Sequence, residues 1–189
     1  MNPVDYAKLA KQAYIDIPSV GLPQSASRMH VYGDVHVFRG SDDMESWIAD
    51  LTVVPQQVWG LGYVHAGFYG ALAAILPACL ALPRPTAITG HSLGAAMAIL
   101  YAGVLALMRQ PVPVFAFEPP KLCADGTLAN LMKIMDVPFY ATRNGNDVVP
   151  TVPPAMTLPG TLTQIGRPTA PFPNIEDHNI DRVIESLAA

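Results

Sequence analysis

The chain has 189 residues, of which 51% are hydrophobic and 14% are charged, so it can bury a sizeable core and is not of the disordered class. Its formal net charge is −4, and it carries no basic block that would neutralise phosphates, which argues against nucleic acid as a partner. The length fits one domain spanning residues 1–189. No window of about 18 uninterrupted apolar residues is present, so we expect no membrane-spanning helix.

The N-terminal segment and the cysteines bear on the cellular compartment. Residues 1–16 include Asp5, Lys8 and Lys11 and lack a continuous apolar region, so they do not resemble a signal peptide. The two cysteines, Cys79 and Cys123, have neither metal-like spacing nor a disulfide framework. We therefore expect a cytoplasmic location, although a mature secreted chain without its leader would show the same pattern.

The first part of the chain predicts two helices on either side of a pair of strands. Apolar residues at helical spacing predict a helix over about 4–14. The segment HVYGDVHVFRG predicts two short strands about a turn at Gly33 and Asp34. A second, amphipathic helix is expected over 42–51, where apolar residues fall at i, i+3, i+4 and i+7, namely Met44, Trp47, Ile48 and Leu51.

Further along, helices and strands alternate regularly. Helices are expected over about 67–80, 95–108, 128–135 and 180–187, and strands over about 86–89, 112–118 and 137–144. Prolines interrupt residues 150–173, which predicts a shaped loop region with one short strand at 162–165. Strands that alternate with helices form βαβ units, so the predicted fold class is α/β, with a mainly parallel sheet covered by helices on both faces.

The segment TGHSLGA, residues 89–95, has Ser92 between two glycines, in the pattern G-x-S-x-G. A short predicted strand precedes it and a long predicted helix follows, as in the turn that presents a nucleophilic serine on a hydrolase sheet. The backbone N–H of Leu93, at the start of that helix, would face a developing oxyanion. The alternative is that Ser92 only caps the helix.

A nucleophilic serine needs a base and an acid, and on this type of sheet they follow it in the order acid, then histidine. His178 is the only histidine after Ser92, so it is the predicted base. Asp147, in a loop just past the strand predicted over 137–144, is the preferred acid, with Glu118 as its rival. Asp125, Asp136, Glu176 and Asp177 are further candidates for the acid. Cys123 is not preceded by such a turn and is a poor alternative nucleophile.

From about Asp34 to the C-terminal helix the chain resembles the class 3 lipases, the fungal-type triacylglycerol lipases of the α/β-hydrolase fold. The resemblance rests on FRGSDDMESWIADLTVVP, VHAGFY, ITGHSLGAAMAIL, PPK after a buried strand, NDVVP and the late His178. It implies a triad of Ser92, Asp147 and His178. It also implies that Ser41, after F-R-G, forms an oxyanion hole together with the N–H of Leu93, and that His65 is structural.

The resemblance gives further expectations and two departures. In the fungal members the segment matching the helix at 42–51 is a lid, and Met44, Trp47, Ile48 and Val54 would line an acyl site; ordinary core packing is the alternative for that helix. Glu118 stands where the family usually has glycine. The stretch between Asp147 and His178 is shorter than in the fungal enzymes, which predicts a more open site.

These observations predict a carboxylic ester hydrolase that works through an acyl-enzyme without metal or organic cofactor. The expected substrate is a small-molecule or lipid ester, with transient contact at a lipid interface and no stable protein partner. Two alternatives remain open at this point: a phospholipase or acyl-thioesterase acting on intracellular acyl donors, and a catalytically silent hydrolase fold used for binding.

Overall fold

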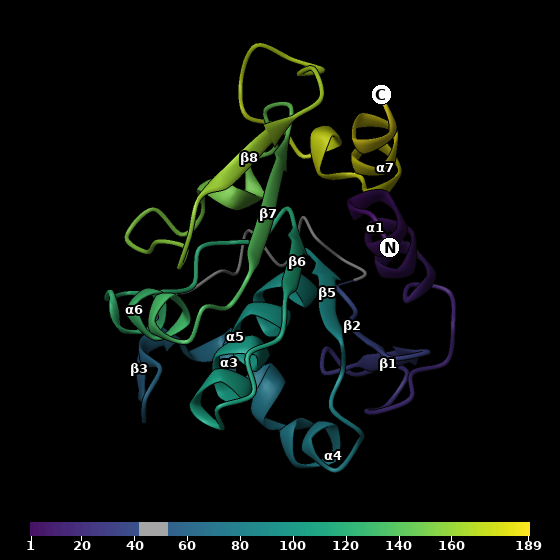
Figure 1. Ribbon diagram of the computed structural model, residues 1–189. Coiled ribbons are helices and arrows are strands. Elements are labelled where there is room, and N and C mark those ends of the chain that lie inside the picture. The colour runs from purple at the N-terminus through teal and green to yellow at the C-terminus, as the bar shows by residue number, and fades with distance from the viewer. Residues whose placement is uncertain (42–52) are drawn as a thin grey trace.

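The computed structural model describes residues 1–41 and 53–189. The helix predicted over 42–51, its possible lid role, and the side chains of Met44, Trp47 and Ile48 lie outside these residues. The main sheet runs in the order β1-β2-β5-β6-β7-β8 (Figure 1). β1 pairs antiparallel with β2, and every other neighbouring pair is parallel. The bounds are β1 Met29–Tyr32, β2 Val35–Phe38, β5 Ala87–His91, β6 Val114–Phe117, β7 Phe139–Asn144 and β8 Leu162–Ile165.

Helices cover both faces of this sheet, as the alternation of elements predicts. α1 (Pro3–Gln12) and α7 (Ile180–Ala188) pack together on one face, and α5 (Leu93–Leu107) lies across β2, β5 and β6 on the other. α3 (Ala66–Ala73) and α6 (Thr127–Ile134) pack against α5 from outside. Helices on both faces of a mainly parallel sheet confirm the predicted α/β class.

The core lies in two layers, and the alternation of side chains along β6 separates them. Val114 and Ala116 belong to the cluster around α5, whereas Phe117 joins the cluster beneath α1 and α7. Tyr6 of α1 stacks on Phe115, with ring centroids 3.9 Å apart, and so continues this second layer. α5 is buried almost all round, which explains why its sequence is apolar on every face rather than amphipathic.

Two local elements differ from the predictions. The single helix expected over 67–80 is wrong: α3 ends at Ala73 and α4 (Leu76–Leu80) begins after a break. Pro77 explains the break, because proline lacks an N–H and is tolerated only in the first turn of a helix. The hairpin of β3 (Pro55–Val58) and β4 (Gly62–His65) was not predicted, since β3 is mostly exposed and lacks an alternating apolar pattern.

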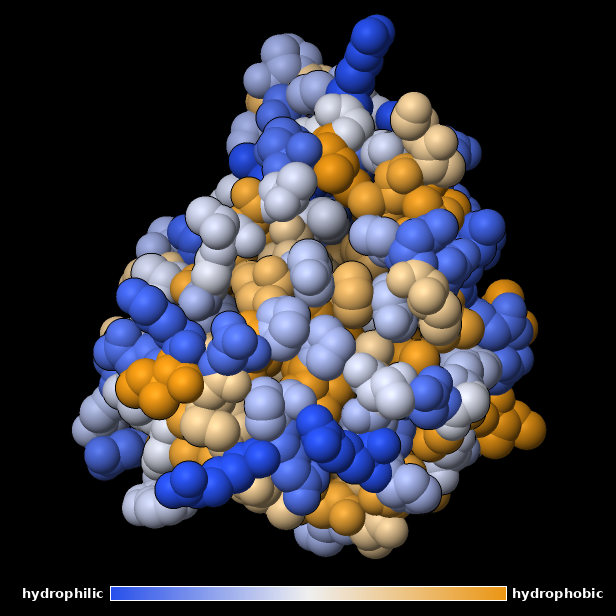
Figure 2. Space-filling view, viewed as in Figure 1, coloured by the Kyte–Doolittle hydropathy of each residue, from blue (hydrophilic) through white to orange (hydrophobic). Residues whose placement is uncertain are grey.

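None of the described helices is long and apolar enough to cross a bilayer. Hydrophobic and hydrophilic side chains are intermixed over the face seen in Figure 2. Cys79 and Cys123 are both buried and unpaired with each other, so the core is held by packing rather than by a bridge between them.

Candidate active site

Ser92 lies at the sharp turn between β5 and α5, at the carboxyl end of the central strand. Its φ of 61° and ψ of −127° lie outside the regions that non-glycine residues ordinarily adopt, a strain of about 1–3 kcal/mol. Its N–H donates to the carbonyl of Phe117, 2.9 Å away, which ties the turn to the end of β6. Ser92 does not cap α5 with its side chain, so the capping alternative is wrong.

The two glycines of the turn are required by close backbone approach. A Cβ at Gly90 would collide with the backbone of Gly94, and a Cβ at Gly94 would collide with the carbonyl of Phe38. Gly90 therefore lets the strand meet the helix, and Gly94 lets the helix meet the end of β2. Phe38 pairs with Gly90 in the sheet, so the loop after β2 begins beside the turn that carries Ser92.

His178 and Asp147, the predicted base and acid, lie side by side in the structure. His178 ends the short 3₁₀ helix η2 (Glu176–His178), and Asp147 follows β7; both side chains are buried. The Nδ1 of His178 lies 2.6 Å from Oδ2 of Asp147. A carboxylate only accepts, so Nδ1 carries the proton, and in the neutral ring Nε2 then has a free lone pair. That Nε2 is buried, with no hydrogen-bond partner among the described residues.

Glu118, the rival acid, does not pair with the imidazole but contacts Asp147. It follows β6 and is fully buried, and one of its carboxyl oxygens lies within 4.8 Å of a carboxyl oxygen of Asp147. Burial raises the pKa of Glu118 well above its ordinary value, and the hydrogen bond and charge of Asp147 raise it further. Its φ of 54° is in the left-handed region that glycine prefers, so a glutamate at this position strains the backbone by about 1–2 kcal/mol.

Oxygen and nitrogen atoms of Glu118, Asp147 and His178 lie within 4.8 Å of one another, a spacing that suits a cation. The hydrogen bonds already present use these atoms differently. Nδ1 of His178 and one oxygen of Asp147 face each other at 2.6 Å, and both oxygens of Glu118 accept hydrogen bonds from residues of β7. The cluster is therefore organised as a hydrogen-bond network.

The side chain of Asp177, the residue before His178, connects two loops of the site. Its buried carboxylate accepts from the N–H of Asn146 at 2.8 Å, from the N–H of Thr169 at 3.2 Å and from the amide of Asn174 at 3.0 Å. Burial alone would raise the pKa of Asp177, but these donors together outweigh it and lower the pKa. Asp177 thus joins the loop that carries Asp147 to the segment that carries His178.

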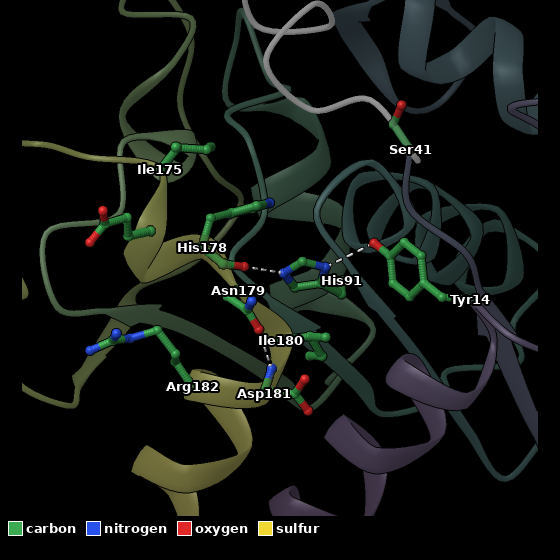
Figure 3. A pocket seen from close by; sticks show the side chains of 10 residues that line it. Tyr14, Ser41, His91, Ile175, His178, Asn179, Ile180, Asp181 and Arg182 are labelled. Carbon is green, nitrogen blue, oxygen red and sulfur yellow. Dashed lines mark hydrogen bonds between the residues drawn. The ribbon is translucent and has the colours of Figure 1, made fainter.

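A second histidine, His91, holds the backbone of His178, and sequence reasoning missed it. Its Nε2 donates to the carbonyl of His178 at 2.8 Å, so Nδ1 is the acceptor for the hydroxyl of Tyr14 at 2.9 Å (Figure 3). Burial, followed by the nearby His178 ring, lowers the pKa of His91 well below its ordinary value, which keeps the ring neutral. Its place just before Ser92 was the available signal, because the end of β5 faces the other residues of the site.

A cleft of about 580 Å³ opens beside these residues. Figure 3 shows Ser41 across the cleft from the segment that carries His178. Leu93 is the first residue of α5, so its N–H has no acceptor within the helix. Val54 is 51% exposed and does not line this cleft. The lining residues are Tyr14, Ser41, His91, Ile175, Glu176, His178, Asn179, Ile180, Asp181 and Arg182.

Comparison with known proteins identifies relatives of this chain. The profile of the family described as lipase (class 3) matches residues 35–157. A lipase of Rhizomucor miehei is 36% identical over 135 residues, which are 63% of this chain and 37% of that protein. The secreted mono- and diacylglycerol lipase 1 of Fusarium solani is 31% identical over 128 residues, covering 61% of this chain and 38% of that protein.

Similar solved structures confirm the expected α/β-hydrolase fold. The crystal structure of the lipase from Rhizopus microsporus var. chinensis superposes with a TM-score of 0.73 at 21% identity, covering 93% of this chain and 84% of that chain. This chain spans little more than a third of the length of the curated relatives that it matches.

The expectation of a cytoplasmic location is wrong, because the relatives are fungal lipases and the one from Fusarium solani is a secreted protein. A core of this size needs no disulfide to fold, so the number of cysteines does not indicate the cellular compartment.

Proposed function

Because this chain belongs to the class 3 lipase family, we propose that it hydrolyses carboxylic esters of lipids, with Ser92, His178 and Asp147 as a catalytic triad. The observation that carries the proposal is the buried 2.6 Å pair of Asp147 and His178, with the second ring nitrogen left free to accept a proton. In a triacylglycerol lipase of the same fold, with a TM-score of 0.66 at 22% identity, a serine protease triad forms the catalytic centre.

The first half of the reaction transfers the acyl group to the enzyme. Ser92 Oγ attacks the ester carbonyl carbon while Nε2 of His178 takes the hydroxyl proton. The resulting imidazolium is stabilised by Asp147, whose carboxylate faces Nδ1. The N–H of Leu93 and the residue Ser41 are proposed to donate to the tetrahedral oxyanion. The intermediate collapses as Nε2 returns the proton to the alkoxide, and the alcohol leaves.

The second half reverses these roles with water. Nε2 of His178 removes a proton from a water molecule, whose oxygen attacks the acyl carbonyl carbon. The same oxyanion donors stabilise the second tetrahedral intermediate, and Nε2 then protonates Ser92 Oγ as the carboxylic acid departs. The histidine must be neutral with its proton on Nδ1 at the start of each half, which is the form that the Asp147 contact favours.

The proposed substrates are acylglycerols, and the proposed location is outside the cell. The Fusarium solani relative is named for mono- and diacylglycerols and as secreted, which supports both statements. The described residues form one main sheet with its helices, which supports a single domain over residues 1–189. The lid and the acyl-lining roles of Met44, Trp47 and Ile48 stay predictions. We expect no metal or organic cofactor in the reaction scheme.

A single substitution tests the mechanism. Ser92→Ala should abolish hydrolysis of p-nitrophenyl butyrate and labelling by a fluorophosphonate probe while the circular dichroism spectrum is preserved. Full activity in this variant would refute the triad, and a wild-type chain that neither reacts with the probe nor hydrolyses esters would favour the silent binding alternative. Rates on mono-, di- and triacylglycerols, a phospholipid and an acyl-thioester, below and above each solubility limit, then identify the substrate class.

A further inference from the structure

Glu118 is a buried carboxyl group that the proposed triad does not use. Both of its oxygens accept from β7: Oε2 from the N–H of Asn144 at 2.8 Å, and Oε1 from the hydroxyl of Thr142 at 3.2 Å. One of its oxygens also lies within 4.8 Å of an oxygen of Asp147, and both residues are fully buried. Two buried carboxyl groups this close repel each other when both are charged, and they can share a hydrogen bond only when one of them carries a proton.

The surroundings decide which carboxyl group carries that proton. Asp147 accepts an N–H on each oxygen, from the backbone of Val149 at 2.9 Å and from His178 Nδ1 at 2.6 Å. The imidazole also becomes a cation during the proposed reaction. Both oxygens of Asp147 are therefore occupied as acceptors of N–H groups, the arrangement of a carboxylate. Glu118 receives one N–H and one neutral hydroxyl, a weaker set of donors, so the proton belongs on Glu118.

We propose that Glu118 is a neutral carboxylic acid whose O–H donates to the Asp147 carboxylate and holds it in place for His178. Glu118 is then a positioning residue, because it acts through Asp147 and does not touch the ester. The proposal rests on the triad proposed above.

Two independent features support this role. The left-handed φ of 54° would suit glycine better than glutamate, so the hydrogen bonds of the side chain must hold the residue in a strained conformation. The burial of Glu118 and its closeness to Asp147 both raise its pKa, as a neutral acid requires. Among the described residues, the charged or titratable groups near Glu118 and Asp147 are His178, His91 beside the His178 ring, and Arg143, whose Nε donates to the Asp147 carbonyl.

The raised pKa makes the folded state sensitive to alkaline pH. A group whose pKa is higher in the folded than in the unfolded state gives its full stabilisation below the unfolded pKa and loses it as pH rises through the folded pKa. Ionised Glu118 would also place a second negative charge beside Asp147. Glutamine cannot ionise, and its amide supplies both a donor for Asp147 and an acceptor for the Asn144 N–H.

Kinetics of Glu118→Ala and Glu118→Gln test the positioning role. Loss of a hydrogen bond to a charged group should lower kcat roughly 10- to 100-fold in Glu118→Ala, with KM changed less than about threefold. The kcat of Glu118→Gln should be at least about tenfold higher than that of Glu118→Ala. Two results would overturn the proposal: Glu118→Gln as impaired as Glu118→Ala, or Glu118→Ala with wild-type kcat.

A second measurement does not depend on activity or on the folding of Glu118→Ala. Thermal unfolding of wild type and Glu118→Gln from pH 5 to 9 should show a stability difference that moves in favour of the glutamine variant as pH rises. Infrared spectra at pH 6 should contain a protonated carboxylic acid band that Glu118→Gln lacks. Glu185→Gln, which changes an exposed carboxylate on α7, is the control and should show neither effect.

The outcomes separate the two proposals. A constant stability difference across pH together with no lost infrared band would overturn the neutral Glu118, whatever the activity. Unchanged activity in Ser92→Ala would overturn the triad, even if Glu118 proves to be protonated.

Discussion

Replacing Asp177 by asparagine should destabilise the protein at neutral pH. The carboxylate accepts from three groups, the N–H of Asn146, the N–H of Thr169 and the amide of Asn174. The side-chain amide of asparagine has only one acceptor oxygen and no charge, and its NH₂ group would face one of the N–H donors that the carboxylate now accepts from. Hydrogen bonds to charged groups are each stronger than neutral ones by about 0.5–2 kcal/mol, so the three together predict a loss of about 2–4 kcal/mol.

The loss should shrink as the solution is acidified. The pKa of Asp177 is lowered in the folded state, so its stabilisation is present above the unfolded value of about 3.9 and is lost as pH falls through the folded value. At neutral pH the full difference between wild type and Asp177→Asn is expected. Below the folded pKa the wild-type side chain is itself neutral, and the two proteins should converge.

Thermal unfolding followed by circular dichroism measures both effects. For a chain of this size a loss of 2–4 kcal/mol corresponds to a Tm lower by about 5–15 °C at pH 7. Asp181→Asn is a matched control, because Asp181 is exposed and its ion pair is with the half-exposed Lys11; it should cost less than about 1 kcal/mol. A Tm difference of the same size at pH 7 and at pH 3 would refute the assignment to the Asp177 charge, and so would an unchanged Tm at pH 7.

Two further substitutions test the site. Asp147→Asn should lower kcat by a factor of about 10³–10⁴ with the fold retained, because His178 loses the carboxylate that keeps its proton on Nδ1. Steady-state kinetics on p-nitrophenyl butyrate measure this loss, and a loss below tenfold would contradict the role of Asp147. Gly94→Ala should destabilise the protein by about 1–3 kcal/mol, because the added Cβ would collide with the Phe38 carbonyl. Thermal unfolding measures this against the control Gly70→Ala, where an added Cβ meets nothing within 4 Å. Equal Tm values for the two variants would contradict the packing argument.

Most of the elements followed from local sequence signals. The strand pair about Gly33, the short strand at Leu162–Ile165 and the long apolar helix after Ser92 were predicted close to their observed bounds. The exceptions have local causes as well. Pro77 divides a stretch that looked like one helix, and the exposed strand β3 shows no apolar alternation from which it could be predicted.

The amino-acid sequence by itself determined the α/β class and a short set of candidate residues. Ser92 was identified by two glycines, and His178 by being the only histidine downstream. The order of residues along the chain can indicate which of them share a site, because a parallel sheet brings the carboxyl ends of its strands to one edge. The sequence ranked Asp147 above Glu118 as the acid but left both as candidates.

Only the tertiary structure decided which side chains meet. It paired Asp147 with His178, set Glu118 behind Asp147, and used Asp177 to join two loops that are far apart in sequence. It also brought Tyr14, from the N-terminal segment, against His91. These contacts depend on side-chain direction and on burial between distant segments. Both are set by how the helices and loops pack on the sheet, which no local pattern encodes.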